Sequence, residues 1–166
     1  VRKAAYWYRR AAEQGDAESQ FALASLFGLV AERKANVVAA QWNSRAASSG
    51  HARAQFKLAE RFAEGRGVKR DLGKAVHWYK RSADLGHDDA QYALGCLHYR
   101  DEESHASDGG PPHNPTRAAF WFGKAAEQGH QGAQQELALM YSEGIGVQKD
   151  GAQAAIWHRR ALQSRG

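Results

Sequence analysis

Three histidines of this 166-residue chain recur at one position of a repeated phrase, and imidazole is a common ligand of zinc. They are His51, His87 and His130, and each directly follows a glycine. If they lie on stacked helices, about 8–10 Å separates them, whereas zinc needs each nitrogen about 2 Å away. We therefore interpret them as polar residues at helix starts, where Asp16 fills the same position as a better cap.

A second group of possible metal ligands or nucleophiles surrounds the single cysteine, and it consists of Cys96, His98, His105 and His113. Their spacing matches no metal-binding motif, and a lone cysteine within a helix usually packs rather than reacts. His98 stands where other copies of the phrase have Phe or Tyr, so we expect a more polar packing position there. The sequence predicts no metal site, no cofactor and no catalytic residue.

Two Gly-x-Gly turns, at residues 65–67 and 144–146, are the segments that most resemble phosphate loops. Neither continues to Gly-Lys-Ser or Gly-Lys-Thr, and both follow a helical pattern where a dinucleotide fingerprint would follow a strand. The motifs Gly-x-Ser-x-Gly and His-Glu-x-x-His do not occur either. We therefore interpret both segments as turns and expect the chain not to be an enzyme.

The elements that position these residues follow from an internal repeat marked by tryptophan. The spacings between successive tryptophans are 35, 36, 43 and 36 residues, and the phrase at residues 74–87, KAVHWYKRSADLGH, returns at 117–130 as RAAFWFGKAAEQGH. We expect one indole to pack between successive helical hairpins, so that Trp78→Ala costs about 3–5 kcal/mol and Trp157→Ala less. The predicted structural residues are Trp7, Trp42, Trp78, Trp121 and Trp157.

A second phrase follows four of the tryptophans, with a glutamine 13 residues after each and a leucine three residues later. Apolar and small residues recur at helical spacing in both phrases, and a glycine closes most of the helices that carry tryptophan. Helices of about three turns are unstable alone, so neighbouring pairs must supply the apolar contacts. The pattern predicts an all-α solenoid of antiparallel helix pairs. The four glutamines are Gln20, Gln55, Gln91 and Gln134.

These two phrases, the Gly-x-Gly-Val turn and the period of about 36 residues resemble the Sel-one-like repeat family. The resemblance implies a right-handed α/α superhelix, similar to tetratricopeptide arrays, that serves as a protein-interaction scaffold without chemistry of its own. We expect a single Sel-one-like repeat array over residues 1–166, and we expect this array to be an excerpt of a longer protein. It comprises an orphan second helix at 1–15 and repeats at about 16–50, 51–86, 87–129 with an inserted loop at 100–116, and 130–166.

The first helix of each repeat carries a variable stripe beside its core stripe, which we predict to line the concave surface and bind a partner. The alternative is a solvated face with no binding role. The role of the inserted loop, recognition or neutral insertion, is left open. The candidate binding residues are Glu18, Ser25, Leu26, Arg53, Lys57, Glu60, Arg61, Glu64, Asp89, Leu97, Arg100, Glu136, Leu139, Met140 and Glu143.

The net charge of +5 does not indicate a nucleic-acid partner. A basic residue stands three positions after every tryptophan, near a predicted helix end, where a cation offsets the helix dipole. No basic patch interleaved with aromatic residues accompanies them, and no apolar stretch of 18 residues predicts membrane insertion. The five basic residues are Arg10, Arg45, Arg81, Lys124 and Arg160.

The sequence therefore predicts a scaffold or adaptor that binds another protein or peptide of unknown identity. One alternative is a cell-wall or lactam hydrolase or a peptidoglycan-binding protein, as the labels of some members of similar families imply. A second alternative is a self-associating structural array. The compartment is left open between cytoplasm and periplasm, because a single cysteine forms no internal disulfide pair and the chain shows no leader.

Overall fold

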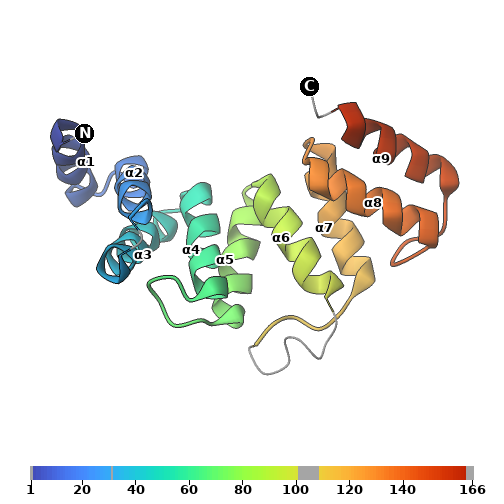
Figure 1. The fold of residues 1–166 in the computed structure, drawn as a ribbon, viewed down its shortest axis with the longest axis horizontal. Helices are drawn as coiled ribbons and strands as arrows, with labels where there is room; N and C mark the ends of the chain where they lie inside the picture. The colour runs from blue at the N-terminus through green and yellow to red at the C-terminus, as the bar shows by residue number, and fades with distance from the viewer. Residues whose placement is uncertain (1, 31, 101–108, 164–166) are drawn as a thin grey trace. The chain divides into compact units, whose positions relative to one another are not determined.

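The chain folds entirely into helices over the residues described by a computed structural model, which are 2–30, 32–100 and 109–163. Nine α-helices and no strand occur in those ranges, which confirms the predicted all-α class of antiparallel helix pairs (Figure 1). The helices fall into two compact units, residues 1–85 and 86–166. None of the described helices combines the length and the apolar character needed to cross a bilayer.

The N-terminal unit contains five helices, and each packs against the next along the chain. One cluster of its core consists mainly of alanines, whose small side chains let the helix backbones approach closely. Ala46, Ala47, Ala54 and Leu58 are buried there, and the rings of Phe21, Phe62 and Trp78 cover them from the sides. The five helices are α1 (Arg2–Glu13), α2 (Ala17–Gly28), α3 (Arg33–Ser48), α4 (Ala52–Glu64) and α5 (Leu72–Asp84).

The C-terminal unit contains four helices, which also pack in chain order (Figure 1). Its central side chain is Phe122, only 1% exposed and surrounded by alanines of its own helix and the next. Gly95 makes room for this ring, since a Cβ atom at that position would lie 2.5 Å from it. The four helices are α6 (Asp88–Tyr99), α7 (Pro115–Glu127), α8 (Gln131–Glu143) and α9 (Gly151–Gln163).

The polar residues before the helices act as N-caps, as the sequence predicts. The Asp16 carboxylate accepts a hydrogen bond from the Ser19 backbone N–H at 2.8 Å. His51 Nδ1 accepts one from the Ala54 N–H at 3.1 Å, and His130 Nδ1 accepts one from the Ala133 N–H at the same distance. His87 occupies the cap position of α6, but its side chain makes no capping bond in the described structure.

The invariant spacing of the glutamines has a structural reason, which is a hydrogen bond between successive repeats. The side-chain amides of Gln20, Gln55 and Gln134 are buried, and each donates to a backbone carbonyl eight residues earlier, at 3.0–3.2 Å. Each carbonyl belongs to an alanine in the last turn of the preceding helix, where carbonyl groups lack partners within the helix. The glutamine therefore ties the start of one hairpin to the end of the previous one.

The tryptophans are less uniformly packed than the sequence predicts. Trp42, Trp78 and Trp121 are half-buried, and Trp157 is 9% exposed. Trp7 is 63% exposed, so the prediction of a packed indole at this position is wrong for the chain as described. Trp157 is also packed more deeply than Trp78, since Trp157 belongs to the core of the C-terminal unit and Trp78 lies at the side of a core. This order of burial is the opposite of the one assumed for the stability effects of Trp78→Ala and Trp157→Ala.

The basic residues three positions after the tryptophans do more than offset the helix dipole. One helical turn places their charged groups over the indole faces, where a cation is attracted by the ring electrons. The guanidinium carbons of Arg45 and Arg160 lie 4.6 and 4.7 Å from the ring centres of Trp42 and Trp157. Arg10 and Arg81 make the same contact at 5.8 and 5.4 Å, whereas Lys124 lies over Phe120.

Candidate functional site

The candidate residues of the N-terminal unit surround a pocket of about 270 Å³ between α2, α3 and α4. Four of the predicted residues line it, Ser25 from α2 and Lys57, Glu60 and Arg61 from α4. Leu26, beside Ser25 on α2, is half-buried and does not line the pocket. The other lining residues are Ala24, Gly28, Leu29, Asn43 and Arg66.

Arg61 is held in place by backbone carbonyls on two sides of the pocket. Its Nη1 donates to the Asn36 carbonyl at 3.2 Å and to the Arg66 carbonyl at 3.3 Å. Burial, followed by the positive charge of Arg66, lowers the pKa of the Arg61 guanidinium. No carboxylate lies within 4.0 Å of it in the part of the chain that the structure describes, so its charge is uncompensated by a direct ion pair.

Two ion pairs neutralise the other charged residues near this pocket. Lys57 Nζ contacts the Glu60 carboxylate at 2.7 Å, and Arg66 pairs with Glu64 on the outer side of the turn. Glu60 is half-buried, whereas Lys57, Glu64 and Arg66 are exposed. A ligand that competes with Glu60 or Glu64 could therefore engage these cations without leaving a deeply buried charge unpaired.

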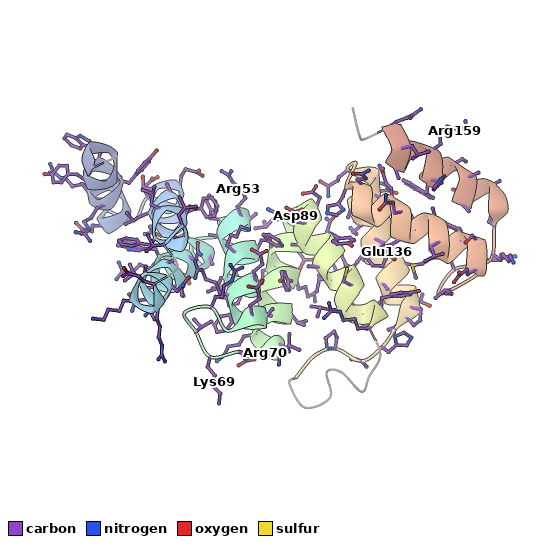
Figure 2. All side chains as sticks on the ribbon, viewed as in Figure 1. Arg53, Lys69, Arg70, Asp89, Glu136 and Arg159 are labelled. Atoms are coloured by element: carbon purple, nitrogen blue, oxygen red, sulfur yellow. The ribbon has the colours of Figure 1, made fainter. Side chains whose placement is uncertain are left out.

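Glu18 and Arg53 belong to a separate network that joins the starts of α2 and α4. Glu18 contacts His51 Nε2 at 2.8 Å and Arg53 at 3.0 Å, and Arg53 in turn lies over the ring of Phe21. Arg53 is labelled on α4 in Figure 2. The hydrogen bond from His51 is the largest cause that lowers the pKa of the Glu18 carboxyl. This network links two consecutive repeats at the surface and leaves the pocket unobstructed.

In the C-terminal unit, the structure separates the predicted residues into surface and core. Leu97 is 8% exposed and Met140 is completely buried, so their assignment to a binding surface is wrong. Both occupy a position of the first helix that faces inward, and their apolar side chains fill the space between helices. The remaining predicted residues reach solvent at least in part, and they are Asp89, Arg100, Glu136, Leu139 and Glu143.

A second, more open pocket of about 520 Å³ lies between α8 and α9. Leu139 is the only predicted binding residue among those that line it. Asp89, labelled at the start of α6 in Figure 2, lies 3.4 Å from His130 Nε2. This pair is equivalent to the pair of Glu18 and His51. The predicted residues of this unit therefore do not converge on one site.

Sequence analysis missed Asn43, which is 3% exposed and lines the first pocket. The repeat itself contained a signal that Asn43 is unusual. The residue directly after the tryptophan is aromatic at Tyr8, Tyr79 and Phe122, whereas it is an amide at Asn43. A comparison of the repeats position by position identifies this exception.

Burial acts against ionisation in the group around Cys96. Burial raises the pKa of the Cys96 thiol, and burial also raises the pKa of the adjacent Tyr92 to about 12. Both shifts disfavour the ionised, nucleophilic forms at neutral pH. His105 lies outside the described residues. The acidic pair Asp88–Asp89 and His87 offer atoms within 4.8 Å of one another, but these are consecutive residues at a helix start.

His98 supports a prediction about pH. Its ring is buried, its Nδ1 lies 3.4 Å from the Pro112 carbonyl, and burial lowers the pKa of the imidazole below 6.5. The unfolded chain then binds a proton more readily than the folded chain, so stability falls as the pH drops below about 6.5. We expect His98→Phe, which restores the residue type of Phe62, to lose less stability between pH 7 and pH 5.

Urea unfolding followed by circular dichroism at several pH values measures this difference. The other histidines are the same in both proteins, so the comparison isolates the contribution of His98. Parallel losses in the two proteins would contradict the assignment of the pH effect to this buried ring.

Repeated helix pairs, joined by glutamine hydrogen bonds and closed by glycine turns, define a helical-repeat protein of the α-solenoid class. The chain belongs to the Sel1 repeat family, whose members are generally protein–protein interaction modules without catalytic activity. The family model, described as Sel1 repeat, matches residues 1–16, 17–51, 52–87, 88–130 and 132–164. No match was found among curated proteins.

Solved structures show the same fold. A protective antigen of uropathogenic Escherichia coli with an SLR fold is 30% identical to this chain and superposes with a TM-score of 0.85. The match covers 98% of this chain and 33% of the antigen. A Sel1 repeat protein from Oxalobacter formigenes is 29% identical to this chain, also with a TM-score of 0.85. This match covers 98% of this chain and 64% of the Oxalobacter protein. This chain therefore spans less than two thirds of either relative. Cysteine-rich protein B of Helicobacter pylori shares the fold, with a TM-score of 0.55 and 17% sequence identity to this chain. The match covers 76% of this chain and 85% of that protein.

Proposed function

We propose that this chain is a scaffold that binds a peptide segment of a partner protein on the first helices of its repeats. The observation that carries the proposal is the pocket of the N-terminal unit, where four independently predicted surface residues converge on one hollow. An interface needs a concave, partly apolar site with a few placed polar groups, and this pocket has that composition. The mechanism is surface complementarity, with no covalent step.

Selection of peptides from a random 12-residue phage-display library, with the purified chain as bait, tests this proposal. We expect enriched peptides whose affinity, measured by fluorescence anisotropy, falls at least about tenfold in Lys57→Glu, because the reversed charge lies beside the pocket. Lys80→Glu is the matched control, since Lys80 is an exposed lysine on α5, a second helix of a repeat. We expect its affinity to stay within about twofold of the original chain.

Two results would count against the proposal. Failure to enrich any peptide would remove the binding function itself. Enriched peptides that respond to Lys80→Glu and not to Lys57→Glu would place binding on the second helices instead.

A further inference from the structure

Two positions of the repeat carry unusual polar residues in the first pocket. The residue after the tryptophan is Tyr8, Tyr79, Phe122 or His158 in the other copies, and the position of Arg61 is Leu26, Leu97 or Met140. Asn43 replaces the aromatic residue found at Tyr79 and Phe122. Arg61 replaces the leucine or methionine found at Leu97 and Met140. The ring of Phe122 fills the core of its own unit, so a short amide in the equivalent place leaves a hollow.

The Asn43 amide is an unsatisfied group inside this hollow. Its side chain is 3% exposed, and its Oδ1 accepts no hydrogen bond from any residue that the structure describes. Leaving a buried acceptor unpaired costs free energy, and an apolar residue of similar size would avoid that cost. A half-turn of the amide exchanges its oxygen and nitrogen without changing its shape, so it can present either edge to a ligand.

Arg61 supplies the complementary charge. Its Nη1 is bonded to carbonyls, while Nη2 lies against Gly28 of α2, where an added Cβ atom would be only 3.0 Å away. No hydrogen-bond acceptor contacts Nη2 among the described residues, and no carboxylate pairs with the guanidinium. The pocket therefore combines an unpaired amide with a half-buried cation that lacks a counter-charge.

The geometry points to this pocket as a binding site for an acidic side chain of an extended partner peptide. Arg61 donates to the peptide's carboxylate, and the Asn43 amide hydrogen-bonds with the adjacent backbone peptide group. At the rim, Lys57 is paired with Glu60 and Arg66 with Glu64, so Arg61 is the cation that determines the sign of ligand charge. This inference rests on the proposed function and specifies which peptides the surface selects and which residues select them.

Three variants of the chain test the inference on the peptides enriched in the phage selection. Asn43→Leu removes the amide at similar size, and Asn43→Tyr fills the hollow with the residue type of Tyr79. Arg61→Met introduces the residue found at Met140. Asn43→Tyr and Arg61→Met introduce residues that other repeats carry at the same positions, and Asn43→Leu keeps a similar size, so we expect all three to remain folded, with Asn43→Leu unfolding at a higher urea concentration than the original chain.

We expect the enriched peptides to carry Asp or Glu at one common position. Their affinity should fall about tenfold to a hundredfold in all three variants, the range for loss of a hydrogen bond to a charged group. Arg33→Met, which removes an exposed arginine from α3, is the matched control and should leave affinity within about twofold. Replacing the common acidic residue of the peptide by Gln or Asn should reproduce the loss seen in Arg61→Met.

The outcomes separate this inference from the proposed function. Peptides that bind, respond to Lys57→Glu and yet tolerate both Asn43→Leu and Arg61→Met would keep the scaffold function and overturn the acidic-peptide pocket. Enriched peptides with no shared acidic position would overturn it as well. If N-acetylglutamate amide alone competes as strongly as the whole peptide, the pocket recognises a free carboxylate and the extended-peptide assignment is wrong.

Discussion

Phe122→Ala is expected to destabilise the chain by about 3–5 kcal/mol, the usual cost of removing a large aromatic ring from a packed core. The ring is 1% exposed and contacts Tyr92 and Tyr99 of α6 in addition to the alanines around it. Gly95 faces the ring and has no side chain that could fill the space left by the substitution. We therefore expect a cavity that the neighbouring helices cannot close by a small shift.

Urea unfolding measured by circular dichroism gives the size of this effect. Phe120→Ala is the matched control, because Phe120 lies on the same helix, is 55% exposed and contacts Lys124 and the neighbouring Trp121. We expect the control to change stability by no more than about 0.5 kcal/mol, as for most surface substitutions. Equal losses for the two phenylalanines would contradict the core assignment.

Gly67→Ala is expected to have the second large effect, because it combines an unfavourable backbone conformation with a collision. Gly67 has a φ angle of +75°, in the left-handed region that disfavours side chains. An added Cβ atom would lie 2.1 Å from the carbonyl oxygen of Asn36, in the first turn of α3. Arg61 donates a hydrogen bond to that same oxygen, so the collision would also disturb the wall of the pocket.

Gly50→Ala separates the two causes. Gly50 has a φ angle of +87°, and an added Cβ atom there would meet no atom within 4 Å among the described residues. We expect Gly50→Ala to cost about 1–2 kcal/mol for the backbone alone, and Gly67→Ala to cost about 2 kcal/mol more. Thermal or urea unfolding of the two variants gives the difference, and similar values for both would show that the close approach to Asn36 is relieved easily.

The repeat made the fold predictable, since residues at equal offsets from each tryptophan must share one structural environment. The caps at Asp16, His51 and His130 were predicted for this reason, because a polar residue recurred at every hairpin start. The same logic failed for Leu97 and Met140, which were placed on the surface as neighbours of a variable stripe. A helix position at the border of two stripes faces solvent or core according to the packing angle of the next helix, which the sequence pattern does not specify.

The candidate site was harder to predict because its defining features are departures from the repeat. Lys57, Glu60 and Arg61 were found as polar residues on a variable stripe. Asn43 belongs to the other helix of its repeat, and only the packing of α3 between α2 and α4 brings its amide to the same hollow. The stacking of Arg45 and Arg160 on indole rings was likewise missed, because the spacing of three residues permits this contact without requiring it, as Lys124 over Phe120 shows.

The hydrogen bonds of Gln20, Gln55 and Gln134 have a consequence for how such arrays grow. At each of these three junctions between helix pairs, a glutamine amide donates to an alanine carbonyl at the equivalent position. An additional helix pair inserted at any of them can therefore form the same hydrogen bond without new complementary residues. Gene duplication within the array thus yields a foldable product at once, and later divergence at positions such as Asn43 can alter recognition while the junctions stay unchanged.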